Sequence, residues 1–243
     1  MELHKDAYKT IYEKEEDHWW FRGRRLIIKD VLDRLGLPQG ARILDVGCGT
    51  GGNLTLLREY GDADGCDFSE EAIRFCKLRG FEHAFQASIY DLPCPDSEYD
   101  LVTCFDVIEH LRLDLPAVRE LNRVCRPGGY LLVTLPAGPA LYSSFDCVAG
   151  HLRRYRREEA VELLTQSGFQ PLRISRYAML MHPLVRFYSW RGGLVGRAKH
   201  TEGMEPIFGA TNALLIRLFE LESLLLRYLD LPRGSSLFAL AAK

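Results

Sequence analysis

The sequence has no run of about 18 uncharged apolar residues, so we expect no membrane-spanning helix. Residues 1–17, MELHKDAYKTIYEKEED, lack the apolar stretch of a secretory signal peptide. Neither sign of charge dominates, because 31 basic and 33 acidic side chains leave a net charge of -2. Without a strongly basic surface, no nucleic-acid partner is expected.

The seven cysteines form no C-x-x-C pair, and their odd number gives no disulfide framework. Most of them lie in apolar strand-like or helix-like stretches, where cysteine behaves as a small hydrophobic residue. We therefore expect a reducing, cytoplasmic setting.

The length of 243 residues, 47% of them hydrophobic, fits one large α/β domain or at most two small ones. No internal repeat or low-complexity linker divides the chain, so we predict a single domain over 1–243. Short apolar stretches alternate with helical patterns, which predicts a parallel sheet with helices on both faces. The predicted strands are residues 41–48, 63–67, 81–87, 99–105, 130–136, 171–179 and 235–243. Helical patterns occupy residues 24–35, 54–60, 116–125 and 156–167, and a further helix begins after Ser69, a plausible N-cap.

The strongest motif is the glycine-rich stretch ILDVGCGTGG at residues 43–52. Glycines after a strand let the backbone turn sharply and leave room for a ligand against bare peptide groups. Asp67 follows Gly47 by 20 residues, at the end of the next predicted strand. A carboxylate there can accept hydrogen bonds from both hydroxyls of a ribose, so a nucleoside-containing cofactor is expected.

Gly47, Gly49 and Gly52 also satisfy the pattern G-x-G-x-x-G, which keeps an NAD(P)-dependent oxidoreductase as an alternative. Three features count against it. Asp45 can hold an ammonium group but has no use beside a pyrophosphate. Roughly forty residues precede the motif, and the sequence has no Tyr-x-x-x-Lys pair for a proton relay.

The stretch ILDVGCGTG resembles the first motif of class I S-adenosylmethionine-dependent methyltransferases of the small type 11/12 kind. The resemblance covers residues 40–178 and, more weakly, the last strand at 235–243. It implies a Rossmann-like, seven-stranded α/β sheet, mostly parallel, with an antiparallel C-terminal strand. It also implies methyl transfer from S-adenosylmethionine to a small, amphiphilic or lipid-like acceptor, with a non-catalytic methyltransferase-like binding protein as an alternative.

The same resemblance implies a set of cofactor-binding residues. In this alignment the methionine part lies near Asp45, Gly47, Cys48 and Gly49, the ribose on Asp67 and the adenine on Phe68. Ser88 stands where many members have an aspartate on the adenine amino group, so backbone groups near Ile89 would recognise the adenine. Residues 99–111, YDLVTCFDVIEHL, are similar to the family's fourth-strand motif and its turn, and within it Phe105 and Asp106 are the remaining candidates for cofactor contact.

Methyl transfer needs a base only if the acceptor is protonated at working pH. His110 and His151 are the candidates, because they follow the fourth and fifth predicted strands, at the edge where open α/β sheets bind ligands. Asp106, Glu109 and His110 have the i, i+3, i+4 spacing that could bind a hard cation on a helix. We favour the interpretation in which Asp106 contacts cofactor or loop backbone while Glu109 and His110 cap the helix, and we predict no metal.

Residues 18–25, HWWFRGRR, contain adjacent tryptophans that are costly to expose. They either anchor the N-terminal helix as a hydrophobic plug or belong to a lid over residues 1–38, with Arg22 or Arg24 at the methionine carboxylate. In the lid hypothesis Trp20 and Arg22 contact the cofactor and Trp19 contacts the acceptor. Arg153 and Tyr155, from a basic cluster at 153–157, are further candidates for binding an acidic group of the acceptor.

Residues 180–230 form a Leu-, Arg- and Gly-rich insertion that we expect to be helical and to build much of the acceptor pocket. A helical wheel of residues 207–231 shows one broad apolar face, and the extra apolar width must be buried somewhere. The face contains Leu214, Leu218, Leu221, Leu225, Tyr228 and Leu229. The apolar arc is widened by Leu215, Phe219 and Leu226, and Glu222 is an exception to the separation of apolar and charged residues. The first half of the insertion is the leading partner for this face. A homodimer and peripheral membrane contact are the alternatives.

Overall fold

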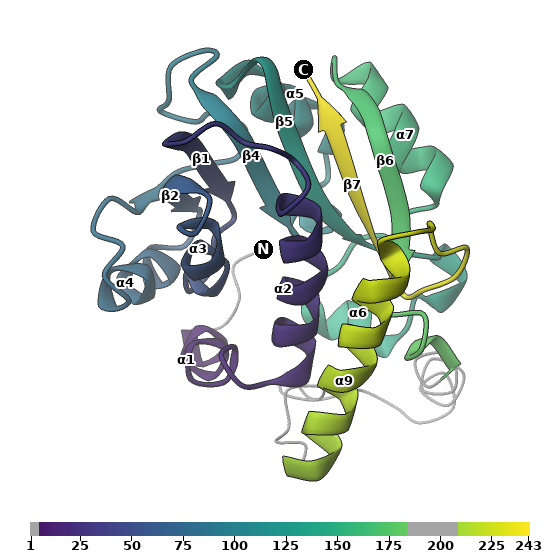
Figure 1. The fold of residues 1–243 in the computed structure, drawn as a ribbon. Coiled ribbons are helices and arrows are strands. Elements are labelled where there is room, and N and C mark those ends of the chain that lie inside the picture. The colour runs from purple at the N-terminus through teal and green to yellow at the C-terminus, as the bar shows by residue number, and fades with distance from the viewer. Residues whose placement is uncertain (1–4, 184–208) are drawn as a thin grey trace.

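One seven-stranded sheet, in the order β3-β2-β1-β4-β5-β7-β6, organises the computed structural model, which describes residues 5–183 and 209–243 (Figure 1). The strands are β1 (Ala41–Val46), β2 (Gly61–Asp67), β3 (Phe85–Gln86), β4 (Tyr99–Phe105), β5 (Cys125–Pro136), β6 (Gln170–Tyr177) and β7 (Ser236–Ala242). Strands β1 to β5 pair in parallel, and β7 pairs antiparallel with both β5 and β6. The predicted mostly parallel sheet with an antiparallel last strand is therefore confirmed.

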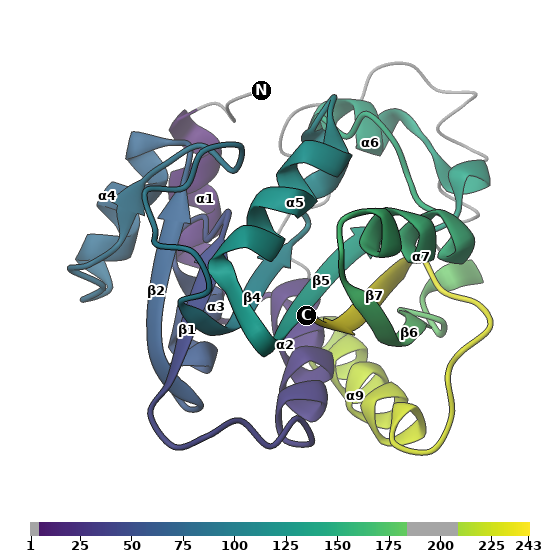
Figure 2. The same cartoon turned by 90° about the horizontal axis from the view of Figure 1, so that it is seen from above.

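Helices cover both faces of this sheet. They are α1 (Lys5–Lys14), α2 (Trp19–Leu32), α3 (Gly52–Leu57), α4 (Glu70–Leu78), α5 (Asp114–Val124), α6 (Ser144–Ala149), α7 (Arg157–Gln166) and α9 (Gly209–Leu226), with short 3₁₀ turns η1 (Ile108–His110) and η2 (Pro139–Leu141). Helices α2 and α9 lie side by side over one face, and α5 and α7 cover the other (Figures 1 and 2). Among the described helices, none is both long and apolar enough to cross a bilayer.

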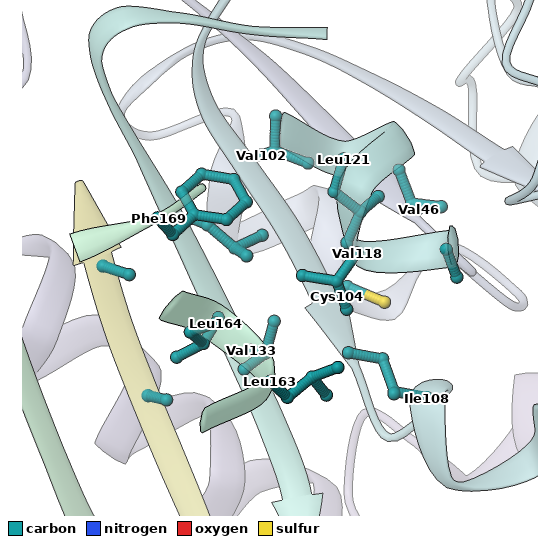
Figure 3. Packing of buried hydrophobic residues seen from close by; sticks show 14 of the residues in the cluster. Val46, Val102, Cys104, Ile108, Val118, Leu121, Val133, Leu163, Leu164 and Phe169 are labelled. Atoms are coloured by element: carbon teal, nitrogen blue, oxygen red, sulfur yellow. The ribbon is translucent and has the colours of Figure 1, made fainter. Parts of the chain in front are cut away.

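The sheet is buried on both faces, which explains why its central strands are continuous apolar runs. Every residue of β4 is buried. Under α5 and α7 the core contains Val102, Cys104, Val118, Leu121, Val133, Leu164 and Phe169 (Figure 3). Five of the seven cysteines are buried as free thiols, as expected for cysteines that act as small hydrophobic residues.

Local capping signals are confirmed where they were expected. The Ser69 hydroxyl accepts a hydrogen bond from the Ala72 N–H at the start of α4. The predicted strand at residues 81–87 is shortened to the two residues of β3. The reason is local: Gly80 has a positive φ of 83° and the N–H of Phe81 bonds back to the Cys76 carbonyl, so this segment closes α4 before the strand begins.

Helix α9, in the second half of the insertion, packs against α2, but on a side shifted from the face that the helical wheel predicted. Leu214, Leu221 and Tyr228 are exposed, at 59%, 50% and 87%. The residues of α9 that are buried are Ile216, Phe219, Glu222, Ser223 and Leu226. Phe219 and Leu226, which widen the predicted apolar arc, are buried, whereas the centre of the predicted face is exposed. The buried side of α9 is therefore shifted from the predicted one, because counting apolar side chains cannot show which side of a helix meets its neighbour. Residues 184–208 of the insertion lie outside the described residues.

Two contacts decide which face of α9 is buried. A Cβ atom at Gly23 of α2 would lie 2.4 Å from the ring of Phe219, so the missing side chain at Gly23 makes room for that ring. The buried carboxylate of Glu222 accepts hydrogen bonds from the backbone N–H groups of Met179 and Leu180, at 2.9 and 3.2 Å. Glu222 therefore holds the backbone that follows β6.

Candidate active site

The glycine loop, residues 47–52, lies where β1 ends, at the carboxyl edge of the parallel strands. The N–H groups of Gly47 and Cys48 donate to the Cys66 carbonyl at 2.8 and 3.0 Å, which holds the loop against β2. At the end of β2, the Asp67 carboxylate accepts from the N–H of Gly49 at 2.9 Å and from the N–H of Ser69 at 2.9 Å. Asp67 therefore connects the glycine loop with the segment between β2 and α4.

The glycines of this loop face different surroundings. An added Cβ at Gly47 would lie 2.3 Å from Val107, and at Gly52 it would lie 2.2 Å from a carboxylate oxygen of Glu15. At Gly49, whose φ is +55°, an added Cβ would have no heavy atom within 4 Å. Within this loop, Gly49 thus combines open space with a backbone conformation that suits glycine, and it is the place where a ligand can approach the backbone.

Asp45 is a buried acid with unused hydrogen-bonding capacity. One carboxylate oxygen accepts from the Thr103 hydroxyl at 2.7 Å, and the other has no partner among the described residues. Burial raises the pKa of Asp45 to about 7, although the Thr103 hydrogen bond and the charge of Arg24 oppose the shift. A cationic ligand group at the free oxygen would satisfy this carboxylate.

Arg24, rather than Arg22, faces the site. Arg22 is exposed on α2, whereas Arg24 is buried and its guanidinium forms an ion pair with Asp106 at the end of β4. Asp106 has a left-handed φ of 54°, and its carboxylate also accepts from the Thr134 hydroxyl at 2.9 Å. The strained conformation and the two partners fix this carboxylate beside the glycine loop.

The residues expected around the adenine lie beyond Asp67 but make few specific contacts. Phe68 is 66% exposed, which leaves its ring free to pack on a ligand. Ile89 is buried, and the Ser88 hydroxyl accepts from the N–H of Tyr90 at 3.3 Å. Phe105 is buried within β4 and supplies the strand end rather than an exposed side chain.

The two adjacent tryptophans attach α2 to its surroundings. The ring of Trp20 stacks on Tyr177 with centroids 6.4 Å apart, and both indoles pack on Phe219 at about the same separation. The backbone N–H of Trp19 donates to Asn212 at 2.8 Å. These contacts support the plug interpretation for the side chains themselves.

A second cluster joins η1 to the loop after α6. The rings of His110 and His151 meet edge to face with centroids 4.9 Å apart. Nδ1 of His151 lies 2.8 Å from a carboxylate oxygen of Asp146, and Nδ1 of His110 lies 3.1 Å from the Gly150 carbonyl. If each Nδ1 carries the proton, both Nε2 atoms are free to accept a proton or bind a ligand.

Asp146 is well equipped to orient His151. Its side chain is fully buried and also accepts from Nε of Arg154 at 2.8 Å and from the N–H of Ser143 at 2.8 Å. Burial alone would raise the pKa of Asp146, but the hydrogen bond with His151 and the Arg154 charge lower it below its usual value. The carboxylate is therefore ionised and stabilises a protonated imidazole.

Glu109 completes this cluster. Its side chain is fully buried, neither oxygen has a hydrogen-bond partner among the described residues, and Oε1 lies 3.8 Å from Nε2 of His151. Burial, together with the nearby Asp106 charge, raises its pKa well above the usual value. The cluster offers three potential ligand atoms, one each from Glu109, His110 and His151, and these atoms lie within 4.8 Å of one another. Its composition and spacing could therefore hold a metal ion.

Arg153 and Tyr155 are engaged elsewhere. Arg153 donates to Asp114 at 2.9 Å, and the Tyr155 hydroxyl donates to the same carboxylate at 3.0 Å. Arg154 is bound to Asp146, so the basic cluster is largely neutralised within the protein. The contacts with Asp114 attach the segment between α6 and α7 to the start of α5. With these contacts in place, neither Arg153 nor Tyr155 is available to bind an acceptor.

Some site residues were missed by the sequence analysis. Asp146 carried a signal, because Ser143 and Asp146 form the S-x-x-D pattern of a capping box, which the structure contains. Glu15 and Arg79, which lie behind the glycine loop, carried none, because one lies in a charged run and the other at the end of an ordinary surface helix.

Comparison with known proteins agrees with this geometry. A family model described as a methyltransferase domain matches residues 44–133, from β1 to β5. A protein of Mycolicibacterium smegmatis named as a probable S-adenosylmethionine-dependent methyltransferase is 30% identical over 67% of this chain. The chain carries a class I S-adenosylmethionine-dependent methyltransferase domain.

Other relatives of this methyltransferase domain are more distant. A probable methyltransferase of Mycobacterium tuberculosis is 29% identical over 66% of the chain. The matches span 63% of the Mycolicibacterium protein and 59% of the Mycobacterium protein. A methyltransferase structure from Thermotoga maritima superposes with a TM-score of 0.61, at 18% identity, over 99% of this chain and all of the other, which shows a shared fold.

Proposed function

We propose that the protein transfers a methyl group from S-adenosylmethionine to a hydroxyl of a small amphiphilic acceptor. The observation that carries the proposal is the open face of Gly49 between Asp67 and the partly unpaired Asp45. A nucleoside, a cationic amino acid group and a carboxylate are the parts that such a site can hold, with Arg24 for the carboxylate.

The residues present fit the cofactor. The free oxygen of Asp45 would accept from its ammonium group, the exposed ring of Phe68 would pack on its adenine, and Asp67 would exchange its loop hydrogen bonds for ribose hydroxyls. When bound, S-adenosylmethionine supplies an electrophilic methyl group on a sulfonium sulfur. An NAD(P) pyrophosphate would meet the carboxylate of Asp45, which disfavours the oxidoreductase alternative.

The histidine cluster would supply the acid–base chemistry. His151 accepts the proton of the acceptor hydroxyl at Nε2, while Asp146 holds the proton on Nδ1 and stabilises the resulting imidazolium. The N-terminal helices α1 and α2 would exclude water from the site. If the cluster instead holds a metal ion, Glu109, His110 and His151 would be its ligands, and the ion would supply Lewis-acid activation of a hydroxyl. Activity would then be lost on chelation.

The acceptor class is supported by one group of relatives. A ubiquinone biosynthesis O-methyltransferase of Bordetella avium is 26% identical over 67% of this chain and 75% of its own length. By its name that relative methylates oxygen in the synthesis of an amphiphilic quinone. The proposed acceptor shares that chemistry, and the insertion at 180–230 would contact its apolar part.

A homodimer through residues 207–231 is the proposed quaternary structure. The exposed Leu214, Leu221 and Tyr228 support it, because apolar side chains of this size gain free energy when a partner covers them. The monomer is the outcome that would refute this part of the proposal, and light scattering after gel filtration distinguishes the two.

Transfer of a labelled methyl group tests the proposed function. The purified protein is incubated with methyl-labelled S-adenosylmethionine and a panel of phenols, catechols and aliphatic alcohols with and without apolar chains. We expect labelled ether products, and much less of them from the Asp67→Ala variant at a limiting concentration of S-adenosylmethionine. Cofactor binding without S-adenosylhomocysteine formation, in the panel and in cell extract alike, would instead support the non-catalytic alternative.

A further inference from the structure

We propose that Glu15 and Arg79 are positioning residues of the cofactor loop, and that they couple the docking of α1 to cofactor binding. The proposal rests on the proposed function, since its measured quantity is the affinity for S-adenosylmethionine. Neither residue belongs to the glycine motif, and both act through Thr50.

Arg79 follows α4 and connects α1 to the loop. Its Nε donates to the Thr50 carbonyl at 2.9 Å, and Nη2 donates to the Glu15 carboxylate at 2.8 Å and to the Tyr12 carbonyl at 2.9 Å. Nη1 donates to the Glu16 carboxylate at 2.7 Å. A guanidinium is suited to this role because its N–H groups have fixed directions, and a lysine could not make the same set of bonds.

Glu15 contacts the loop from the other side. Its side chain is only 7% exposed, and Oε1 accepts from both Arg79 and the Thr50 hydroxyl. The space beside Gly52 is filled by the carboxylate of Glu15, so a side chain at this position would displace Glu15 from its place beside the loop. The Thr50 carbonyl and hydroxyl are thus both held by side chains that meet at the end of α1.

This arrangement acts on the cofactor site more than on the fold. Gly49, with its open face and its N–H on Asp67, is the residue before Thr50. Helix α1 packs on α4 through a small cluster of Tyr8, Ala72 and Phe75 that is separate from the two large cores of the sheet. Loss of the Glu15–Arg79 contact should therefore free the loop and α1 while the sheet stays folded.

Linkage makes the coupling measurable from both ends. If docked α1 stabilises the loop conformation that binds the cofactor, the cofactor must stabilise docked α1 by the same free energy. The wild-type protein should therefore show slower amide exchange over residues 8–16 when S-adenosylmethionine is added.

The experiment compares wild type with Arg79→Met and Glu15→Gln, and uses Arg74→Met as the control. Arg74 lies on α4, the helix that Arg79 follows, and its ion pair with Glu71 is on the surface. Calorimetry gives the dissociation constant for S-adenosylmethionine, and hydrogen exchange gives the protection of residues 8–16. We expect Arg79→Met to weaken binding at least about tenfold and to abolish the added protection, with Arg74→Met equal to wild type.

Glu15→Gln, which keeps the shape of the side chain, should weaken binding several-fold and remains informative if Arg79→Met fails to fold. Affinities within twofold of wild type in the folded variants would overturn the proposal, as would wild-type protection that is unchanged by the cofactor. Wild-type protein that does not bind S-adenosylmethionine at all would overturn the proposed function as well, so the two failures are distinguishable.

Discussion

The N–H of Gly49 donates a hydrogen bond to the Asp67 carboxylate over 2.9 Å, which links two loops 18 residues apart in the sequence. The same carboxylate accepts from Ser69, at the N-terminus of α4. Asp67, which we assign to the ribose, therefore also fixes the backbone of the two loops around it. Its removal would affect both ribose binding and loop conformation.

Replacement of Asp67 by alanine should weaken S-adenosylmethionine binding at least about tenfold. Two hydrogen bonds from the ribose to a charged acceptor are lost, each worth roughly 1.5–3 kcal/mol. Calorimetry on the folded variant, with circular dichroism as the control for the sheet, checks the result. Unchanged affinity would remove Asp67 from the cofactor site.

Asp45 should make cofactor affinity depend on pH. Because its pKa is raised to about 7, it is largely protonated below that pH and cannot pair with an ammonium group. Affinity for S-adenosylmethionine should therefore fall as the pH decreases from 8 to 6, and Asp45→Asn should bind weakly with little pH dependence over that range. A wild-type affinity independent of pH would contradict the ion pair.

The same carboxylate should affect stability without cofactor. A folded-state pKa raised from 3.8 to about 7 means that, between about pH 4 and 7, the folded protein holds a proton that the unfolded chain has lost. The Asp45 contribution to stability is then lost as pH rises, by at most about 1.4 kcal/mol per pH unit. Urea unfolding of wild type and Asp45→Asn across this range should show the difference, and parallel curves would refute it.

His151 and Asp146 should affect turnover and not cofactor binding. Loss of a general base costs about 10²- to 10⁴-fold in kcat, so His151→Ala should fall in that range with its S-adenosylmethionine affinity retained. Asp146→Asn should lose part of the same effect, because the amide no longer stabilises the imidazolium. Full activity of His151→Ala with a hydroxyl acceptor would exclude the proposed base. Loss of wild-type activity on chelation would favour the metal arrangement.

Two truncations distinguish the two hypotheses for the N-terminal segment, a lid over the cofactor and a hydrophobic plug. Removing residues 1–17 deletes Glu15 but leaves the tryptophan pair, so the sheet should stay folded while cofactor affinity drops. Removing residues 1–22 also deletes Trp19 and Trp20, which pack on Phe219, and should cost at least about 3 kcal/mol in the free energy of unfolding. Equal stability of the two truncated forms, measured by urea unfolding, would refute the plug.

A matched pair on α9 tests which face of that helix is buried. Phe219 is 1% exposed beside Gly23, so Phe219→Ala should lower the free energy of unfolding by about 3–5 kcal/mol. Leu221 is 50% exposed, so Leu221→Ala should lower it by less than about 1 kcal/mol in the monomer. A larger loss of unfolding free energy for Leu221→Ala than for Phe219→Ala would show that the side of α9 with Leu221 is the buried one.

Much of the fold could be predicted because its signals are local. The apolar run and glycines of residues 41–52 specify a strand that enters a turn, and Ser69 caps a helix by a bond to its own first turn. Asp45 and Asp67 could be assigned to the site because they adjoin strand ends, and parallel strands end at one edge.

The rest depends on contacts between distant segments. The buried face of α9 is decided by Gly23, 196 residues before Phe219, and no helical wheel contains that information. Arg153 fits an acceptor ligand by its place in the sequence, but in the structure it pairs with Asp114, 39 residues earlier. Arg22 and Arg24 differ by two positions in one helix, and only the packing of α2 shows which of them meets Asp106.

The central claim is that the open face of Gly49 binds S-adenosylmethionine, and calorimetric titration of the wild-type protein tests it most directly. S-adenosylmethionine, NAD and NADP are titrated separately into the protein and into Asp67→Ala. We expect one site per chain for S-adenosylmethionine, with an affinity weakened at least about tenfold by the substitution, and no heat of binding for the dinucleotides. Binding of NAD or NADP that Asp67→Ala abolishes, with none of S-adenosylmethionine, would contradict it.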